Sequence, residues 1–189
     1  MPPIPLPRPP LTEGDIRLRP WERRDVKAVT AACQDREIPR WTVVPHRYTE
    51  RHARDFIHGT GIDLANGREL ALAIVDQHDG LLGALGLSNF DWADLKGEIG
   101  YWVVAEVRRR GIGSRATGLL AIWAITELGL ERVELLANPE NRASLRLAER
   151  AGFRREGTLR RYRRRHGARE DLVMFSLLAE DLADGVPRR

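Results

Sequence analysis

One stretch of this 189-residue chain, residues 101–114, constrains the fold more than any other. It begins with an apolar run at residues 101–104, whose β-branched and aromatic side chains are typical of a buried strand. An arginine-rich turn with two glycines follows, made of Arg108, Arg109, Arg110, Gly111, Ile112, Gly113 and Ser114. A long apolar helical pattern comes next, so free backbone N–H groups and the positive end of a helix dipole meet at the turn. The sequence therefore predicts a phosphate-binding turn.

Two other nucleotide-binding motifs compete for this turn. A Walker A loop needs Gly-Lys-Ser/Thr, and no such triplet occurs in the chain. The dinucleotide fingerprint G-x-G-x-x-G/A fits residues 111–116, but five residues separate its glycines from the strand. That fingerprint also calls for an acidic residue after the next strand, where this chain has Asn138. The motif R-x-x-G-x-G, at residues 108–113, fits better than either.

This R-x-x-G-x-G motif resembles the pyrophosphate-binding signature of the GCN5-related N-acetyltransferases (GNAT), which bind acetyl-coenzyme A (acetyl-CoA). Its surroundings resemble the RimJ/RimL branch, whose founding members acetylate the N-termini of ribosomal proteins. These surroundings are residues 100–104, 127–135, 138–144 and 149–153. The resemblance extends more loosely from residue 16 to residue 182. It implies an α/β GNAT fold, a single domain with a mixed, strongly twisted sheet of about seven strands flanked by about four helices.

The hydrophobic periodicity and the turn residues predict elements that agree with this fold. Strands are expected at residues 16–19, 69–76, 81–90, 97–104, 132–137, 157–163 and 171–178, the last two joined through His166-Gly167. Helices are expected at residues 21–34, 49–59 and 141–151 and directly after Gly113, whereas residues 38–48 are interpreted as a loop. The strands on either side of the helix after Gly113 should run parallel. The domain is expected over residues 15–182, between a disordered Pro-rich leader (1–14) and a frayed tail (183–189).

The composition of the chain indicates the cellular environment and the kinds of partner to expect. Cys33 is the one cysteine, so no intramolecular disulfide can form, and without a signal-like N-terminus a cytoplasmic location is expected. No apolar run is long enough to span a membrane, and the histidines form no cluster that predicts a metal site. Residues 154–169 carry eight arginines against one acid, Glu156. This excess charge could attract an acidic acceptor, contact ribosomal RNA or only aid solubility, but with Tyr162 as its one aromatic it predicts no specific nucleic-acid site.

The resemblance implies that acetyl-CoA is the co-substrate and suggests how it is held. The turn residues, Arg108 to Ser114, would bind the pyrophosphate. The end of the preceding strand, Trp102, Val103 and Val104, would be splayed from its neighbour and pair with the pantetheine arm. The predicted coenzyme site is completed by Asn138, Asn141 and Ser144. Asn141 also suits the N-cap of the following helix, and the two roles are compatible.

Acetyl transfer to an amine requires loss of a proton from the amine and stabilisation of the leaving thiolate. Many relatives place a tyrosine seven residues after the asparagine, where this chain has Ala148. In the RimL-like branch a serine at the position of Ser144 is proposed to assist the thiolate instead. Glu98 is the predicted general base, because the glutamate that relatives use on the following strand is Leu136 here. Other carboxylates, or water alone, stay open as alternatives.

Together these features predict an acetyl-CoA-dependent N-acetyltransferase that works by direct attack in a ternary complex. By resemblance, the expected acceptor is the N-terminal α-amino group of a protein, which could be ribosomal. Acetylation of a small amine, such as an antibiotic or a polyamine, is the alternative within enzymes. A CoA-binding module without catalysis is the alternative from another class. The sequence leaves open whether the protein is a homodimer.

Overall fold

The computed structural model describes residues 3–165 and 167–183, and its centre is a mixed sheet. Within these residues the sheet has eight strands in the order β1-β2-β3-β4-β5-β6-β8-β7. They are β1 (Thr12–Glu13), β2 (Ile16–Pro20), β3 (Leu70–Asp76), β4 (Leu81–Asp91), β5 (Lys96–Val103), β6 (Arg132–Ala137), β7 (Arg154–Arg165) and β8 (Ala168–Leu178). All neighbouring strands are antiparallel except β5 and β6, which run parallel as predicted. The α/β fold expected from the resemblance is confirmed.

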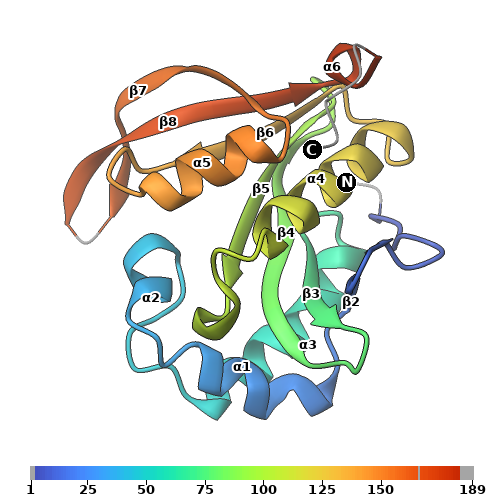
Figure 1. Cartoon of the computed structure of the whole chain (residues 1–189), viewed down its shortest axis with the longest axis vertical. Helices are drawn as coiled ribbons and strands as arrows, with labels where there is room; N and C mark the ends of the chain where they lie inside the picture. The colour runs from blue at the N-terminus through green and yellow to red at the C-terminus, as the bar shows by residue number, and fades with distance from the viewer. Residues whose placement is uncertain (1–2, 166, 184–189) are drawn as a thin grey trace.

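The described residues contain six α-helices and two short 3-10 turns. The helices are α1 (Val26–Ala32), α2 (Glu37–Trp41), α3 (Glu50–Ala65), α4 (Ile112–Thr126), α5 (Arg142–Arg150) and α6 (Ala179–Ala183). The 3-10 turns are η1 (Arg23–Asp25) and η2 (Ala105–Val107). In Figure 1 the tip of the β7–β8 hairpin reaches toward α2, and α5 lies beneath the hairpin.

Two hydrophobic clusters occupy the two faces of the sheet, and β3 contributes to both. Leu70, Leu72 and Ile74 belong to the larger cluster, which also holds the buried face of α4. The intervening Ala73 and Val75 belong to the smaller cluster, which is covered by α1 and α3. Side chains alternate between the faces of a strand, so a strand buried on both faces is apolar throughout. This explains why the sequence of β3 has no polar side.

The parallel pair β5 and β6 stays together for only three residues. Lys96, Gly97 and Glu98 lie opposite Arg132, Val133 and Glu134, and no pairing follows. Beyond Glu98, β5 continues to Val103 and β6 continues to Ala137 as separate strands. The sheet therefore opens into a gap between these two strands, as the resemblance implies. The gap opens on the side toward the glycine turn.

The N-terminal segment differs from the expected disordered leader. Ile4 is buried in the larger cluster, and its N–H donates to the carbonyl of Leu64 at the end of α3 (3.1 Å). Leu6 and Leu11 pack against the same cluster, and the short strand β1 pairs with β2. The apolar residues between the prolines explain the difference, because an extended segment can bury them without a periodic pattern.

Several other boundaries were misjudged. The expected helix 21–34 is the turn η1 followed by the shorter α1, and the last strand begins at Ala168 rather than at residue 171. Residues 37–41, expected to be loop, form helix α2, which buries Ile38 and tolerates Pro39 in its first turn, where no N–H is needed. Helix α3 passes through Gly59 and ends at Ala65, because tertiary packing outweighs the weak helix propensity of glycine. Strand β7 begins at Arg154 rather than at residue 157. His166 in the expected turn and nearly all of the expected frayed tail (183–189) lie outside the described residues.

Candidate functional site

The glycine turn is shaped by backbone conformation and by close packing. Gly111 is the N-cap of α4 in the left-handed conformation (φ 78°), which favours glycine. At Gly113 a Cβ atom would lie only 2.5 Å from Leu147 Cδ1 of α5. No side chain caps the first N–H groups of α4. These N–H groups are therefore free to bind an anion, aided by the helix dipole.

A cavity of about 550 Å³ joins this turn to the gap between β5 and β6. Its lining comes from the turn and the start of α4, the end of β5, one face of α5 along its length, and α2. The lining includes Glu37, Trp41, Thr42, Tyr101, Trp102, Val103, Arg108, Arg109, Gly111, Ile112, Gly113, Ser114, Asn141, Ser144, Arg146 and Arg150. Its volume is typical of a small-molecule site. Of the predicted coenzyme residues, the structure brings most to this one cavity; Val104, Arg110 and Asn138 do not line it.

At alternate residues of β5, the backbone N–H and C=O groups point toward the gap between β5 and β6. The N–H of Val104 donates to the carbonyl of Leu82 on β4 (2.9 Å). Directly opposed residues of an antiparallel pair alternate between bonded and non-bonded. Trp102, opposite Ala84, therefore also bonds to β4, and the groups of Tyr101 and Val103 face the gap. Among the backbone groups expected to be free at residues 102–104, those of Val103 face the gap, together with those of Tyr101; coenzyme contact by Trp102 and Val104 stays a prediction.

Arg108 lies in the turn but directs its side chain back toward the protein. Its Nε donates to the carbonyl of Val103 (3.0 Å), and its guanidinium forms an ion pair with Asp35, between α1 and α2. Arg108 thus connects the turn to β5 and to the segment before α2. Arg109 and Arg110 have no acidic partner among the described residues.

Asn141 and Ser144 lie at the start of α5. The side chain of Asn141 accepts the N–H of Ser144 (3.1 Å), so it is the N-cap that the sequence predicts. The Ser144 hydroxyl lies 2.7 Å from the Tyr101 hydroxyl on β5. Burial raises the pKa of Tyr101 to about 12, although the bond to Ser144 acts in the opposite direction. Tyr101 therefore carries its proton at neutral pH.

Sequence reasoning missed Tyr101 as a site residue. A signal was present, because Tyr101 is two residues before Val103 and must share its face of the strand. Arg146 and Arg150 were also missed; they are four residues apart, the spacing that places two side chains on one face of a helix.

Asn138 and Glu98 lie outside the cavity lining. The Asn138 amide donates to Glu170 (3.0 Å) and its oxygen accepts the N–H of Glu140 (2.9 Å), so both groups hold the turn between β6 and α5. Glu98 lies three residues before Tyr101 on β5 and accepts a hydrogen bond from the side chain of Asn89 (2.9 Å). Their predicted roles, coenzyme contact and general base, stay predictions.

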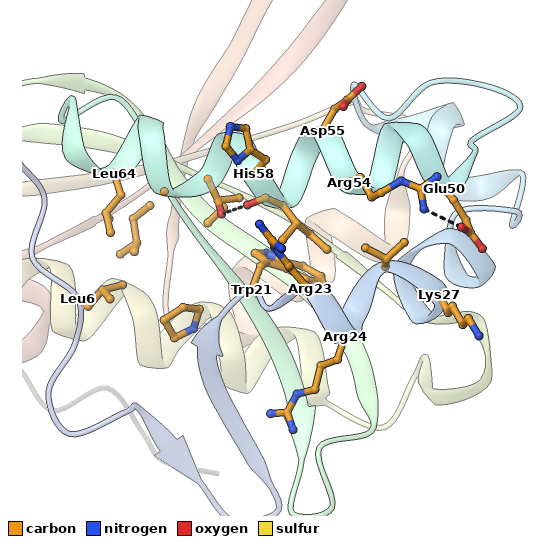
Figure 2. Close-up of a pocket in the computed structure, with 17 residues that line it drawn as sticks. Leu6, Trp21, Arg23, Arg24, Lys27, Glu50, Arg54, Asp55, His58 and Leu64 are labelled. Atoms are coloured by element: carbon orange, nitrogen blue, oxygen red, sulfur yellow. Dashed lines mark hydrogen bonds and ion pairs between the residues drawn. The ribbon is translucent and has the colours of Figure 1, made fainter.

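A larger cavity, of about 960 Å³, lies elsewhere, between the N-terminal segment, the start of α1 and α3. Figure 2 shows Leu6 and Leu64 at one end of it and Lys27 and Glu50 at the other. None of the residues predicted for the coenzyme or for catalysis lines it. Volume alone does not identify the site, because the glycine turn and its free N–H groups are in the smaller cavity.

Comparison with known proteins identifies the class that this fold and turn define. Residues 15–154 match the family model described as an acetyltransferase (GNAT) domain. Because this match covers most of the chain, the protein belongs to the GNAT acetyltransferase family.

Three relatives indicate where the chain belongs within the family. "Uncharacterized N-acetyltransferase p20" of Bacillus licheniformis is 29% identical over 169 residues, which are 89% of this chain and 95% of the relative. "Putative ribosomal N-acetyltransferase YdaF" of Bacillus subtilis (strain 168) is 38% identical over 117 residues, 61% of this chain and 62% of the relative. The structure of Mycobacterium smegmatis RimJ in complex with CoA-disulfide has a TM-score of 0.80 and 27% identity, over 88% of this chain and 83% of that one.

The protein is thus an acetyl-CoA-dependent N-acetyltransferase of GNAT type with RimJ/RimL-like relatives, as the sequence predicted. No helix among the described residues is both long and apolar enough to span a membrane.

Proposed function

We propose that this enzyme acetylates the N-terminal α-amino group of a protein, by direct attack of the amine on bound acetyl-CoA. The observation that carries this proposal is the lack of a free carboxylate among the described residues of the cavity lining. Four arginines, Arg108, Arg109, Arg146 and Arg150, line it against a single acid, Glu37. Glu37 is itself engaged by Trp41 and Arg40 of the same helix.

This lining argues against a cationic small acceptor. A polyamine or an aminoglycoside carries several positive charges and needs carboxylates to bind it, and Glu37, the one acid of the lining, is already engaged. A peptide N-terminus brings only one amine, and that amine is neutral when it reacts. The relative YdaF is named as a ribosomal N-acetyltransferase, which agrees with a protein acceptor.

The proposed placement of acetyl-CoA follows the cavity. The pyrophosphate would accept hydrogen bonds from the N–H groups of Ile112, Gly113 and Ser114 at the start of α4. The pantetheine arm would pair with the outward-facing backbone of Tyr101 and Val103 in the gap between β5 and β6. The thioester would then lie near Ser144. The α2 side of the cavity, with Trp41 and Thr42, would receive the acceptor.

In the proposed reaction the amine lone pair attacks the thioester carbonyl carbon. The new C–N bond forms, the C–S bond breaks, and the electron pair of that bond leaves on sulfur. The Ser144 hydroxyl would donate to the thiolate, and Tyr101, whose hydroxyl lies 2.7 Å away, would donate to the Ser144 oxygen. The attacking nitrogen then loses a proton to water, and the thiolate takes up a proton, so the products are the acetylated amine and free CoA.

Deprotonation of the acceptor needs little help if the acceptor is an α-amine. Such amines have a pKa of about 7.7–8.0, against about 10.4 for a lysine side chain. A substantial fraction is therefore neutral at physiological pH, and water can remove the proton. Glu98 stays the predicted base for any assisted step. The cytoplasm, where new protein N-termini arise, stays the predicted location.

The test uses two peptides of the same length that differ in which amine they carry. One has a free N-terminus and no lysine, and the other has a formyl-blocked N-terminus and one lysine. Mass spectrometry of the products after incubation with acetyl-CoA should show acetylation of the first peptide alone, on its α-amine. Acetylation of the blocked peptide alone would overturn the proposal.

A further inference from the structure

Three arginines gather beside the glycine turn without acidic partners. Arg109 belongs to the turn, and Arg146 and Arg150 belong to α5; all three line the cavity. None of them forms an ion pair with an acid anywhere in residues 3–165 and 167–183. Most arginines elsewhere on the fold are paired, as Arg115 is with Asp15 and Arg132 with Glu156. An unpaired group of like charges is favourable only when an anion joins it.

The two arginines of α5 are placed by the packing of that helix on α4. Leu147, between them, approaches Gly113 so closely that a Cβ there would lie 2.5 Å away. Further along, the carbonyl of Ala151 lies 3.4 Å from the Cβ position of Gly118. The two helices thus run side by side in the same direction. Arg146 therefore lies beside the glycine turn, and Arg150 lies beyond the glycine turn, further from Ser144.

This order along α5 matches the order of groups in the coenzyme. Along α5, Ser144 lies beside the position proposed for the CoA sulfur, and Leu147 lies beside the glycine turn proposed for the pyrophosphate. Arg150 lies about one helical turn beyond Leu147. In CoA the group beyond the pyrophosphate is an adenosine whose ribose carries a 3′-phosphate. That phosphate brings up to two negative charges in addition to those of the pyrophosphate.

We propose that Arg146 and Arg150, with Arg109, form a second anion subsite that binds the 3′-phosphate of CoA. The enzyme thereby selects CoA over dephospho-CoA, which lacks only this group. The subsite rests on the coenzyme placement given under the proposed function. Arg150 also lies in the last turn of α5, where a cation is favourable for the helix dipole. That role does not explain Arg146, which lies one turn earlier on the same face.

The test is calorimetric binding of CoA and of dephospho-CoA, with no acceptor present. The unaltered enzyme should bind CoA at least about tenfold more tightly than dephospho-CoA, the size expected for charge-assisted hydrogen bonds. In the double variant Arg146→Gln/Arg150→Gln, the ratio of the affinities for CoA and dephospho-CoA should fall close to one, because only the binding of CoA weakens. Arg142→Gln is the control, because Arg142 is exposed on the same helix but does not line the cavity.

Equal affinity of the unaltered enzyme for both ligands would overturn the subsite. So would a ratio that the double variant leaves unchanged while circular dichroism shows it folded. Binding of dephospho-CoA to the unaltered enzyme reports separately on the pyrophosphate turn. Failure of the subsite and failure of the proposed coenzyme placement are therefore distinguishable.

Discussion

The hydroxyl of Tyr101 on β5 lies 2.7 Å from the hydroxyl of Ser144 on α5, although 43 residues separate them in the chain. The two elements meet at the point where β5 has parted from β6. The contact brings two proton-donating groups to the same wall of the cavity. Four predictions concern the residues around this contact and the turn beside it.

Replacing either hydroxyl should slow the reaction without weakening coenzyme binding. Ser144→Ala removes the group proposed to donate to the thiolate, and Tyr101→Phe removes the group that donates to Ser144. We expect turnover to fall at least about tenfold in both variants, because a positioned proton donor contributes at least that much. Initial rates and calorimetric CoA affinities measure the two effects separately. Tyr162→Phe, which alters an exposed tyrosine, is the control. Normal turnover in both site variants would show that Ser144 and Tyr101 have only structural roles.

Tyr101 should also affect stability at alkaline pH. Burial raises its pKa from 10.0 to about 12, so between these values the unfolded chain has lost a proton that the folded protein keeps. The free energy of unfolding therefore falls as pH rises through this window. Cys33 and Tyr48, whose pKa values burial also raises to about 12, contribute in the same direction. Urea unfolding of Tyr101→Phe should show a shallower alkaline decline than the unaltered protein, and parallel declines would contradict the raised pKa.

The Arg108–Asp35 ion pair should support coenzyme binding indirectly. If Arg108 acts by holding the turn to β5 and the segment before α2, Asp35→Asn should weaken CoA binding about fivefold, the equivalent of roughly 1 kcal/mol. A direct phosphate contact by Arg108 predicts the opposite, because Asp35→Asn would free the guanidinium. Glu106→Gln removes an equal charge next to the turn and is the matched control. Calorimetric CoA affinities of Asp35→Asn and of the unaltered enzyme show whether the substitution weakens or strengthens binding.

Gly113 should not tolerate even a methyl group. Gly113→Ala places a Cβ 2.5 Å from Leu147 Cδ1 and 3.2 Å from Val103 Cγ2, so the Leu147 side chain must leave its position in the contact with α4 or α5 must shift. We expect a loss of about 1–3 kcal/mol in the free energy of unfolding, together with weaker CoA binding. Gly157→Ala is the control, since its Cβ would meet no atom within 4 Å. Equal stability and equal CoA affinity in the two variants would show that the close approach at Gly113 is not needed.

Local chemistry was enough to predict much of this site. The glycine turn, the N-cap at Asn141 and the parallel pair β5 and β6 depend on residues close together in sequence, whose patterns have direct structural consequences.

Contacts between distant segments could not be predicted in this way. Arg108 and Asp35 are 73 residues apart in the chain, so their ion pair leaves no local pattern, and an arginine beside a glycine turn by itself suggests a phosphate ligand. The approach of Tyr101 to Ser144 depends on how α5 docks against β5. The burial of Ile4 depends on the end of α3, which is about sixty residues away in sequence.

The central claim is acetyl transfer from acetyl-CoA to a protein α-amine, and thiol release tests it most directly. The assay follows free CoA with a panel of unblocked peptides, aminoglycosides and polyamines at one acetyl-CoA concentration. The account predicts release with peptides and none above background with the multiply charged small amines. Release with the small amines alone would contradict it.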